Sequence, residues 1–218
     1  MQRFRNRRMA GQKLGEELAA YRDREDAIVL GLARGGLPVA FEVAMSLNAP
    51  MDVFLVRKLG VPGREELAMG AIASGGIRVV NDDVVRSLGV SDEDIEEVAE
   101  REQKELQRRE EAYRGDRPSP RLEGRTVILV DDGMATGASM KSAVEAVKEA
   151  GPRAVVVAIP TAAPQTVEEI SEQVDDVVCL ITPQPFMAVG TWYEDFSQTT
   201  DEEVKNYLDR AADELPSP

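Results

Sequence analysis

Residues 125–150 read RTVILVDDGMATGASMKSAVEAVKEA, and this stretch decides the fold. Four apolar residues at 127–130 predict a buried strand that ends at two adjacent acids, Asp131 and Asp132. Apolar residues then recur at helical spacing up to position 150, where Gly151 and Pro152 provide a stop signal. The short turn at 133–139 is therefore predicted to join a strand to the N-terminus of a helix.

Such a turn is suited to binding a phosphate group. Unpaired backbone N–H groups and the positive end of the helix dipole face outward at a helix N-terminus. Gly133 and Gly137 would let a ligand approach the backbone closely. The two carboxylates repel a phosphate, so we expect them to bind hydroxyl groups or a bridging Mg²⁺. A sugar phosphate with free hydroxyls satisfies both halves of the motif.

The segment VDDGMATGAS resembles the phosphoribosyl pyrophosphate (PRPP) motif of the type I phosphoribosyltransferases. The resemblance implies that Asp131 and Asp132 bind the ribose hydroxyls and, through water or PRPP, Mg²⁺. It also implies a 5′-phosphate site made by Gly133, Met134, Ala135, Thr136, Gly137, Ala138 and Ser139. An ordinary strand-to-helix turn with an acidic start is the alternative interpretation.

The composition limits which chemistry is available. The 218 residues, 43% of them hydrophobic, are enough for one domain with a sizeable core. The chain has no histidine and a single cysteine, Cys179, which excludes histidine bases, Cys/His zinc sites and intrachain disulfides. Cys179 lies in the apolar run VVCLI, so we expect a buried, unreactive thiol. Catalysis must use carboxylates, Lys, Arg, backbone amides or Mg²⁺.

The formal net charge of −14 argues against general nucleic-acid binding, because such binding depends on neutralising phosphates. No apolar run is long enough to span a bilayer, and none follows the N-terminal MQRFRNRR, so we expect a cytoplasmic protein. The one basic cluster consists of Arg3, Arg5, Arg7 and Arg8. We expect a solvated end that pairs with acids elsewhere; a phosphate contact is the alternative.

Strand and helix signals alternate along the chain. They predict helices at 9–20 and 37–47, strands at 27–32 and 51–56, a loop at 57–64, and a hairpin of 67–73 with 77–80. Short β-branched strands separated by helices indicate an α/β fold with a Rossmann-like parallel sheet covered on both faces. Ligands bind beyond the carboxyl ends of the strands in such sheets.

An acidic segment at 91–114 interrupts this alternation. It is strongly helical, with Ser91 as N-cap and Asp94 where a full capping box has Glu or Gln, so only an approximate box is expected. Its thin apolar stripe predicts one narrow packing face. We predict a single domain over 1–218, with a core at about 20–181, a helical insertion at 82–120 and a C-terminal hood at 182–218.

Two further loops resemble the parts of the same family that handle pyrophosphate. The turn of Arg34, Gly35 and Gly36 resembles the family's pyrophosphate loop. The sequence RKLGVPG is similar to the opening of the flexible catalytic lid in adenine phosphoribosyltransferases. This likeness implies pyrophosphate contacts for Arg57 and Lys58, and it makes Glu66 a candidate proton donor to the base.

The segment TPQPFMAVGTWYEDFS at 182–197 resembles the stretch that closes over the nucleobase in purine phosphoribosyltransferases. The likeness implies that Phe186 stacks on the base, that Val189 and Gly190 contact its edge, and that Asp195 is an acid on the metal side. The spacing from Gly190 to Asp195 is one residue longer than in hypoxanthine-type enzymes, so Trp192 or Tyr193 is the alternative base contact. Core packing is the alternative interpretation of these aromatic residues.

The resemblance as a whole implies a type I phosphoribosyltransferase. Such an enzyme uses Mg²⁺ and displaces pyrophosphate from PRPP with a nucleobase nitrogen, and the likeness also implies a homodimer. Ala135 stands where hypoxanthine-type enzymes carry an acid, which favours an adenine-like or unconventional acceptor. The alternatives are a PRPP-binding regulator without transfer activity and a phosphate-binding α/β protein unrelated to PRPP.

Overall fold

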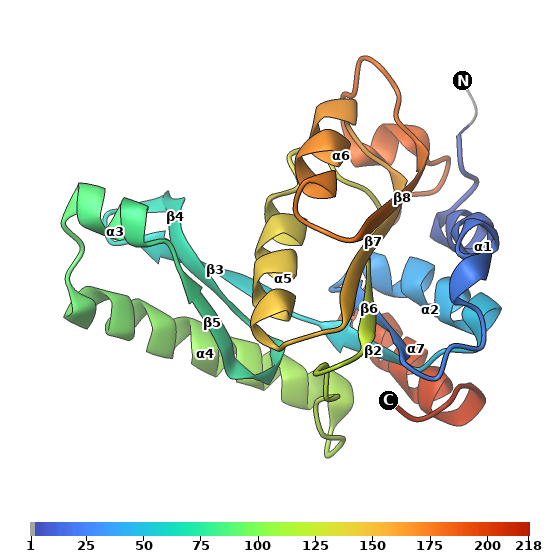
Figure 1. Ribbon diagram of the computed structural model, residues 1–218, viewed down its shortest axis with the longest axis horizontal. Helices are drawn as coiled ribbons and strands as arrows, with labels where there is room; N and C mark the ends of the chain where they lie inside the picture. The colour runs from blue at the N-terminus through green and yellow to red at the C-terminus, as the bar shows by residue number, and fades with distance from the viewer. Residues whose placement is uncertain (1–2) are drawn as a thin grey trace.

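Five parallel strands form the central sheet of the computed structural model, which describes residues 3–218 (Figure 1). Their spatial order is β2-β1-β6-β7-β8. The strands are β1 (Ala27–Leu32), β2 (Met51–Phe54), β6 (Thr126–Val130), β7 (Ala154–Thr161) and β8 (Asp176–Ile181). Because β1 and β6 are parallel neighbours, the loops that follow them lie at one edge of the sheet. The predicted Rossmann-like α/β fold is confirmed.

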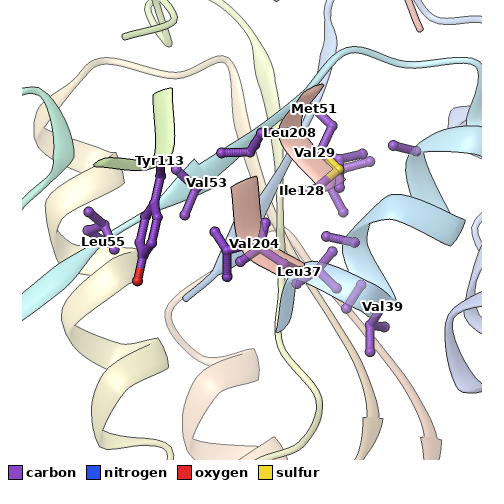
Figure 2. Close-up of a cluster of buried hydrophobic side chains, with 14 of the residues drawn as sticks. Val29, Leu37, Val39, Met51, Val53, Leu55, Tyr113, Ile128, Val204 and Leu208 are labelled. Atoms are coloured by element: carbon purple, nitrogen blue, oxygen red, sulfur yellow. The ribbon is translucent and has the colours of Figure 1, made fainter. Parts of the chain in front are cut away.

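Helices cover both faces of this sheet, because alternate strand residues are apolar on both sides. One face carries α1 (Arg7–Glu17), α2 (Gly36–Leu47) and α7 (Asp201–Glu214), and the other carries α5 (Ala138–Glu149) and α6 (Pro164–Ser171). Figure 2 shows the first core, in which Val29 and Ile128 of the sheet pack with Leu37, Val204 and Leu208. Within residues 3–218, no helix combines the length and apolarity needed to cross a membrane.

A second, antiparallel sheet forms an arm that projects from the body (Figure 1). Its strands are β3 (Val56–Val61), β4 (Arg64–Ala73) and β5 (Ile77–Val80), and α3 (Asp82–Leu88) and α4 (Asp92–Arg114) follow them. The predicted loop at 57–64 is wrong, because most of it is strand. Leu59 and Val61 are buried in the core that also contains α4 residues, and the chain reverses at Gly63, whose φ is +72°.

The insertion helix α4 is capped more completely than the sequence indicates. The Asp94 amide donates to Ser91 Oγ at 3.1 Å, and the Ser91 amide donates back to Asp94 Oδ2 at 3.4 Å. Aspartate therefore closes a full capping box. The predicted apolar stripe is confirmed, since Ile95, Val98, Leu106 and Tyr113 are all buried.

The two ends of the chain differ from expectation. Helix α1 begins and ends earlier than predicted, because the Asn6 side chain accepts the Met9 amide at 2.9 Å and caps the helix. The C-terminal region divides into two parts. Residues 182–200, which we call the hood, follow β8, whereas α7 packs in the main core through Val204, Leu208 and Ala211.

Cys179 is half-buried, and burial raises the pKa of its thiol to about 11.

A buried ion pair fastens the end of α4 to the sheet edge. The Arg114 guanidinium bonds both carboxylate oxygens of Asp52 at 2.9–3.0 Å, and it also donates to Glu110, Ser119 and the Val53 carbonyl. Both side chains of the Arg114–Asp52 pair are more than nine-tenths buried. The arm is therefore anchored at its root by a fully paired charge.

Arg114→Met should lower the free energy of unfolding by about 3–5 kcal/mol, because it leaves the Asp52 charge buried without its partner. Urea unfolding measures this loss. Arg86→Met, which removes the exposed pair with Asp83, is the matched control and should cost far less. Equal effects of the two substitutions would contradict the anchoring role of Arg114.

Candidate functional site

The loops that follow β1 and β6 touch each other beyond the carboxyl ends of these strands. A Cβ atom on Gly35 would lie 2.2 Å from Asp132 Oδ2, and one on Gly36 would lie 2.6 Å from the Val130 carbonyl oxygen. Only glycine allows this approach. The structure thus brings the predicted pyrophosphate loop directly against the acids predicted to bind ribose.

Each of these acids has one carboxylate oxygen engaged and one free. Asp131 Oδ1 accepts the Asp132 amide at 2.8 Å, and Asp132 Oδ2 accepts Arg7 Nε at 2.8 Å. Among residues 3–218, no donor bonds Asp131 Oδ2 or Asp132 Oδ1. The site therefore presents two unpaired acceptors from adjacent residues, which suits two neighbouring hydroxyl groups.

Burial and like charge shape the protonation of this pair. Burial, followed by the charge of Asp132, raises the pKa of Asp131 well above the usual aspartate value. Burial also raises the pKa of Asp132, while the Arg7 guanidinium opposes that shift. Arg7 thus favours the charged form of one acid of the pair.

The turn between β6 and α5 borders a hollow of about 160 Å³, which is lined by Asp131 and the residues of 133–140. Gly137 has a φ of +70° as the residue before α5. In the described part of the chain, the amides of 135–137 donate to no protein acceptor. These amides, together with the first turn of α5, form a cradle for an anion. The structure thus places the predicted 5′-phosphate residues around one cavity.

The far side of this turn is fixed to neighbouring elements. The Met134 amide donates to the Thr161 carbonyl at 2.9 Å, and the Ala163 amide donates to the Met134 carbonyl at 3.0 Å. Thr166 Oγ1 donates to the Ala135 carbonyl at 2.6 Å. These bonds hold the cradle in place without using the amides that face the hollow.

Arg34, in the loop after β1, is held by the start of α7. Its Nη1 lies 3.6 Å from Asp201 Oδ1, and Tyr113 of α4 donates its hydroxyl to the same oxygen at 2.5 Å. Neither residue was predicted to belong to the site: Asp201 lies in no recognisable motif, and Tyr113 was predicted only as part of the apolar face of the helix at 91–114. The positive charge that Arg34 brings to the predicted pyrophosphate loop is therefore already paired with Asp201.

The hood closes against the phosphate turn. A Cβ atom on Gly133 would lie 2.6 Å from Val189 Cγ1, so Val189 lies directly on the turn. The rings of Phe186 and Trp192 are 6.3 Å apart, and only 6% of Trp192 is exposed. Trp192 packs inside the hood, and its buried Nε1–H has no partner in residues 3–218. The base-binding roles of Phe186, Val189 and Trp192 stay predictions.

The predicted lid residues are paired within the arm. Arg57 Nη2 lies 2.5 Å from Glu102 Oε2 of α4, and Lys58 Nζ donates to the Glu66 carbonyl at 3.1 Å. The Glu66 side chain is fully exposed. Over the described chain, no hydrogen bond or ion pair joins these residues to the turn at 131–139. Their catalytic roles also stay predictions.

Arg7 and Tyr193 contact Asp132 directly. Sequence analysis expected the basic N-terminal cluster to pair with acids, and Arg7 does so, but only 11% of its side chain is exposed. The interpretation as a solvated end is wrong for Arg7. Tyr193 donates its hydroxyl to the Asp132 carbonyl at 2.6 Å. No local pattern links positions so far apart in the chain, so their proximity could not be foreseen.

Asp131 and Asp132 carry the free oxygens that a hard cation such as Mg²⁺ prefers. Asp195 instead accepts the Ser197 amide through Oδ1 at 3.0 Å. In residues 3–218, no three acidic, histidine or cysteine side chains cluster as metal ligands. The two acids therefore fit a Mg²⁺ that is completed by ligand oxygens, and the role of Asp195 stays a prediction.

Two free carboxylate oxygens and an amide-lined anion cradle thus lie together beyond the parallel sheet of an α/β protein. Residues 4–195 match the family model for the phosphoribosyl transferase domain. The chain belongs to this family of transferases, which confirms the resemblance of its PRPP motif.

Relatives support this assignment. Proteins from two strains of Mycobacterium tuberculosis, both named "Putative phosphoribosyl transferase", are 47% identical over 211 residues, which is 97% of this chain. The chain spans about half the length of these curated relatives, 47% in each case. The crystal structure of the protein TT1426 from Thermus thermophilus is similar with a TM-score of 0.84 and 47% identity, over 94% of this chain and 97% of that one.

Asp131→Asn should raise the free energy of unfolding at pH 7. The pKa of Asp131 is above its usual value of 3.8 in the folded protein, so ionisation of this group destabilises the fold as pH rises above that value. Asparagine keeps the acceptor for the Asp132 amide without the charge. Urea unfolding measures the gain, which should vanish as pH falls below about 4.

The exposed acid Asp213 in α7 provides the control, since Asp213→Asn should change stability little at either pH. A loss of stability in Asp131→Asn at pH 7 would show that the buried like charges are not the dominant effect at this site.

Proposed function

We propose that the protein is a Mg²⁺-assisted phosphoribosyltransferase that transfers the 5-phosphoribosyl group of PRPP to a nucleobase nitrogen. In this reaction the bond from C1 of the ribose to the pyrophosphate oxygen breaks, and a bond from C1 to the ring nitrogen forms. The ring nitrogen loses its proton, and pyrophosphate leaves. The product is a nucleoside 5′-monophosphate, which is the chemistry of nucleotide salvage.

One observation carries the proposal. Asp131 lines the hollow of the amide-lined turn at 133–139, and Asp131 Oδ2 and Asp132 Oδ1 are the free oxygens of the two residues that lead into this turn. A 5-phosphoribosyl group carries two hydroxyls and a phosphate on one small ring. It therefore matches two acceptors beside an anion cradle, whereas a simple phosphate would leave the free oxygen of each carboxylate without a hydrogen-bond donor, next to its own charge.

The second loop supplies what a leaving pyrophosphate needs. Arg34 contributes a guanidinium, and the loop packs against the acids through Gly35 and Gly36. As the bond to C1 lengthens, positive charge develops on the ribose and negative charge on the pyrophosphate. The carboxylates of Asp131 and Asp132 stabilise the first charge, and Arg34 stabilises the second. Catalysis then depends on positioning and electrostatics and uses no covalent nucleophile.

Mg²⁺ fits this arrangement as a partner of the substrate. It is commonly bound by one or two carboxylates together with substrate phosphates, and Asp131 and Asp132 would provide the protein oxygens. Bound there, Mg²⁺ would neutralise charge on the pyrophosphate. We further propose that the protein works as a cytoplasmic homodimer and that its acceptor is adenine-like, since Ala135 offers no acid to the base.

Replacing both acids tests the ribose site. Asp131→Asn combined with Asp132→Asn should abolish detectable PRPP binding in isothermal calorimetry with Mg²⁺, because the charged hydrogen bonds to the ribose hydroxyls are lost. Binding of inorganic phosphate to the cradle should remain. PRPP binding that survives both substitutions would contradict the proposal and favour a phosphate-binding protein unrelated to PRPP.

A regulator that binds PRPP without transferring it remains the second candidate, and the pairing of Arg57 with Glu102 favours it. Pyrophosphate release separates the two. With PRPP and Mg²⁺, we expect release on addition of one of adenine, hypoxanthine, guanine, xanthine, uracil or orotate. PRPP binding without release for any of them would favour the regulator.

A further inference from the structure

The start of α1 reaches into the proposed ribose site. Arg7 Nε donates to Asp132 Oδ2 at 2.8 Å, and nearly nine-tenths of each side chain is buried. An exposed ion pair of this kind would contribute little. A buried pair differs, because removing one partner leaves an uncompensated charge. Arg7 therefore belongs to the interior of the site.

The hood holds the same guanidinium from another side. Arg7 Nη1 donates to the Ser197 carbonyl at 2.6 Å, and Arg7 Cζ lies 3.9 Å from the centroid of the Phe196 ring. A flat guanidinium can donate in its plane to a carboxylate and a carbonyl while its face stacks on an aromatic ring. Arg7 thus connects Asp132 to the hood.

Tyr193 makes a second connection between the hood and the same acid. Its hydroxyl donates to the Asp132 carbonyl at 2.6 Å. Its ring centroid lies 5.6 Å from that of Phe4 and 5.1 Å from that of Phe196. We call Phe4, Arg7, Tyr193 and Phe196 the N-terminal clasp. It joins the start of the chain and the hood around one carboxylate.

The clasp leaves one oxygen of that carboxylate available. Because a carboxylate is planar, a bond from Arg7 to Oδ2 also fixes the direction of Oδ1. The Asp132 backbone is held as well, because its amide donates to Asp131 Oδ1 and its carbonyl accepts the Tyr193 hydroxyl. The free Oδ1 is consequently oriented before any ligand arrives.

We propose that Arg7 is a positioning residue for the ribose: through the N-terminal clasp it orients Asp132 so that Oδ1 faces a ribose hydroxyl, and it couples this acid to the hood. The inference rests on the proposed function. Without Arg7 the ligand itself would have to order the Asp132 side chain, and this ordering lowers affinity. The phosphate cradle at 133–139 makes no bond to Arg7, so it should be unaffected.

Calorimetry with two ligands tests this role. Arg7→Met should weaken binding of D-ribose 5-phosphate by about tenfold or more, since a charge-assisted contact is lost. Binding of inorganic phosphate should be unchanged. Arg8→Met is the matched control: Arg8 is largely exposed and, among residues 3–218, pairs only with Glu42, so this substitution should leave both affinities unaltered. Arg7→Lys should recover part of the loss, because it keeps the charge near Asp132.

The single tryptophan gives a readout that requires no ligand. The Phe4 amide donates to the Trp192 carbonyl at 2.8 Å, so a loosened clasp should expose the Trp192 ring. Acrylamide should quench the fluorescence of Arg7→Met more strongly than that of the unaltered protein or of Arg8→Met. Phe196→Leu, which keeps the ion pair and removes the ring contacts of Phe196 with Arg7 and Tyr193, should shift both readouts in the same direction by less.

The outcomes separate this inference from the proposed function. If the unaltered protein binds ribose 5-phosphate and Arg7→Met binds it equally well, only the role of Arg7 is overturned. Equal weakening of ribose 5-phosphate and inorganic phosphate would also overturn it, because that result indicates general loss of structure. If the unaltered protein binds phosphate but neither ribose 5-phosphate nor PRPP, the proposed function fails and the role of Arg7 fails with it.

Discussion

Two adjacent carboxylates at the end of a buried strand are the constraint around which this protein is arranged. Asp131 and Asp132 repel each other in a place where water can do little to screen them. The surroundings offset part of this cost with the Asp132 amide and the Arg7 guanidinium. What is left over is one free oxygen on each acid. Hydroxyl donors on a ligand would bond these free oxygens and so offset the repulsion between the two buried carboxylates.

Charged groups of the candidate site are paired inside the protein. Arg7 pairs with Asp132, Arg34 with Asp201 and Arg57 with Glu102. In each pair one partner comes from a helix: Arg7 from α1, Asp201 from α7 and Glu102 from α4. A negatively charged ligand that engages Arg34 or Arg57 must therefore exchange one partner for another, and this exchange lowers the net affinity contributed by each contact. The helices α1, α4 and α7 thus influence the site by pairing with its charged side chains.

Much of this architecture could be predicted from local sequence. The apolar run at 127–130, the acids and the glycine turn identify a strand, a site and a helix without reference to the rest of the chain. The arm was predicted less well, because the strand at 57–61 begins with two charged residues and continues with three buried positions, so its sequence lacks the alternation typical of a strand and resembles a loop. The contact of Arg7 with Asp132 joins residues 125 positions apart, and neither spacing nor composition encodes such a meeting. Pairings of this kind follow from the topology of the sheet.

The central claim is that the free oxygens of Asp131 and Asp132 bind ribose hydroxyls. The most direct measurement compares the affinities of ribose 5-phosphate and 2-deoxyribose 5-phosphate for the unaltered protein by calorimetry. Loss of one hydroxyl removes a hydrogen bond to a charged group, so we predict affinity about tenfold or more lower for the deoxy sugar. Equal affinities would contradict the account, since the protein would then be binding the phosphate alone.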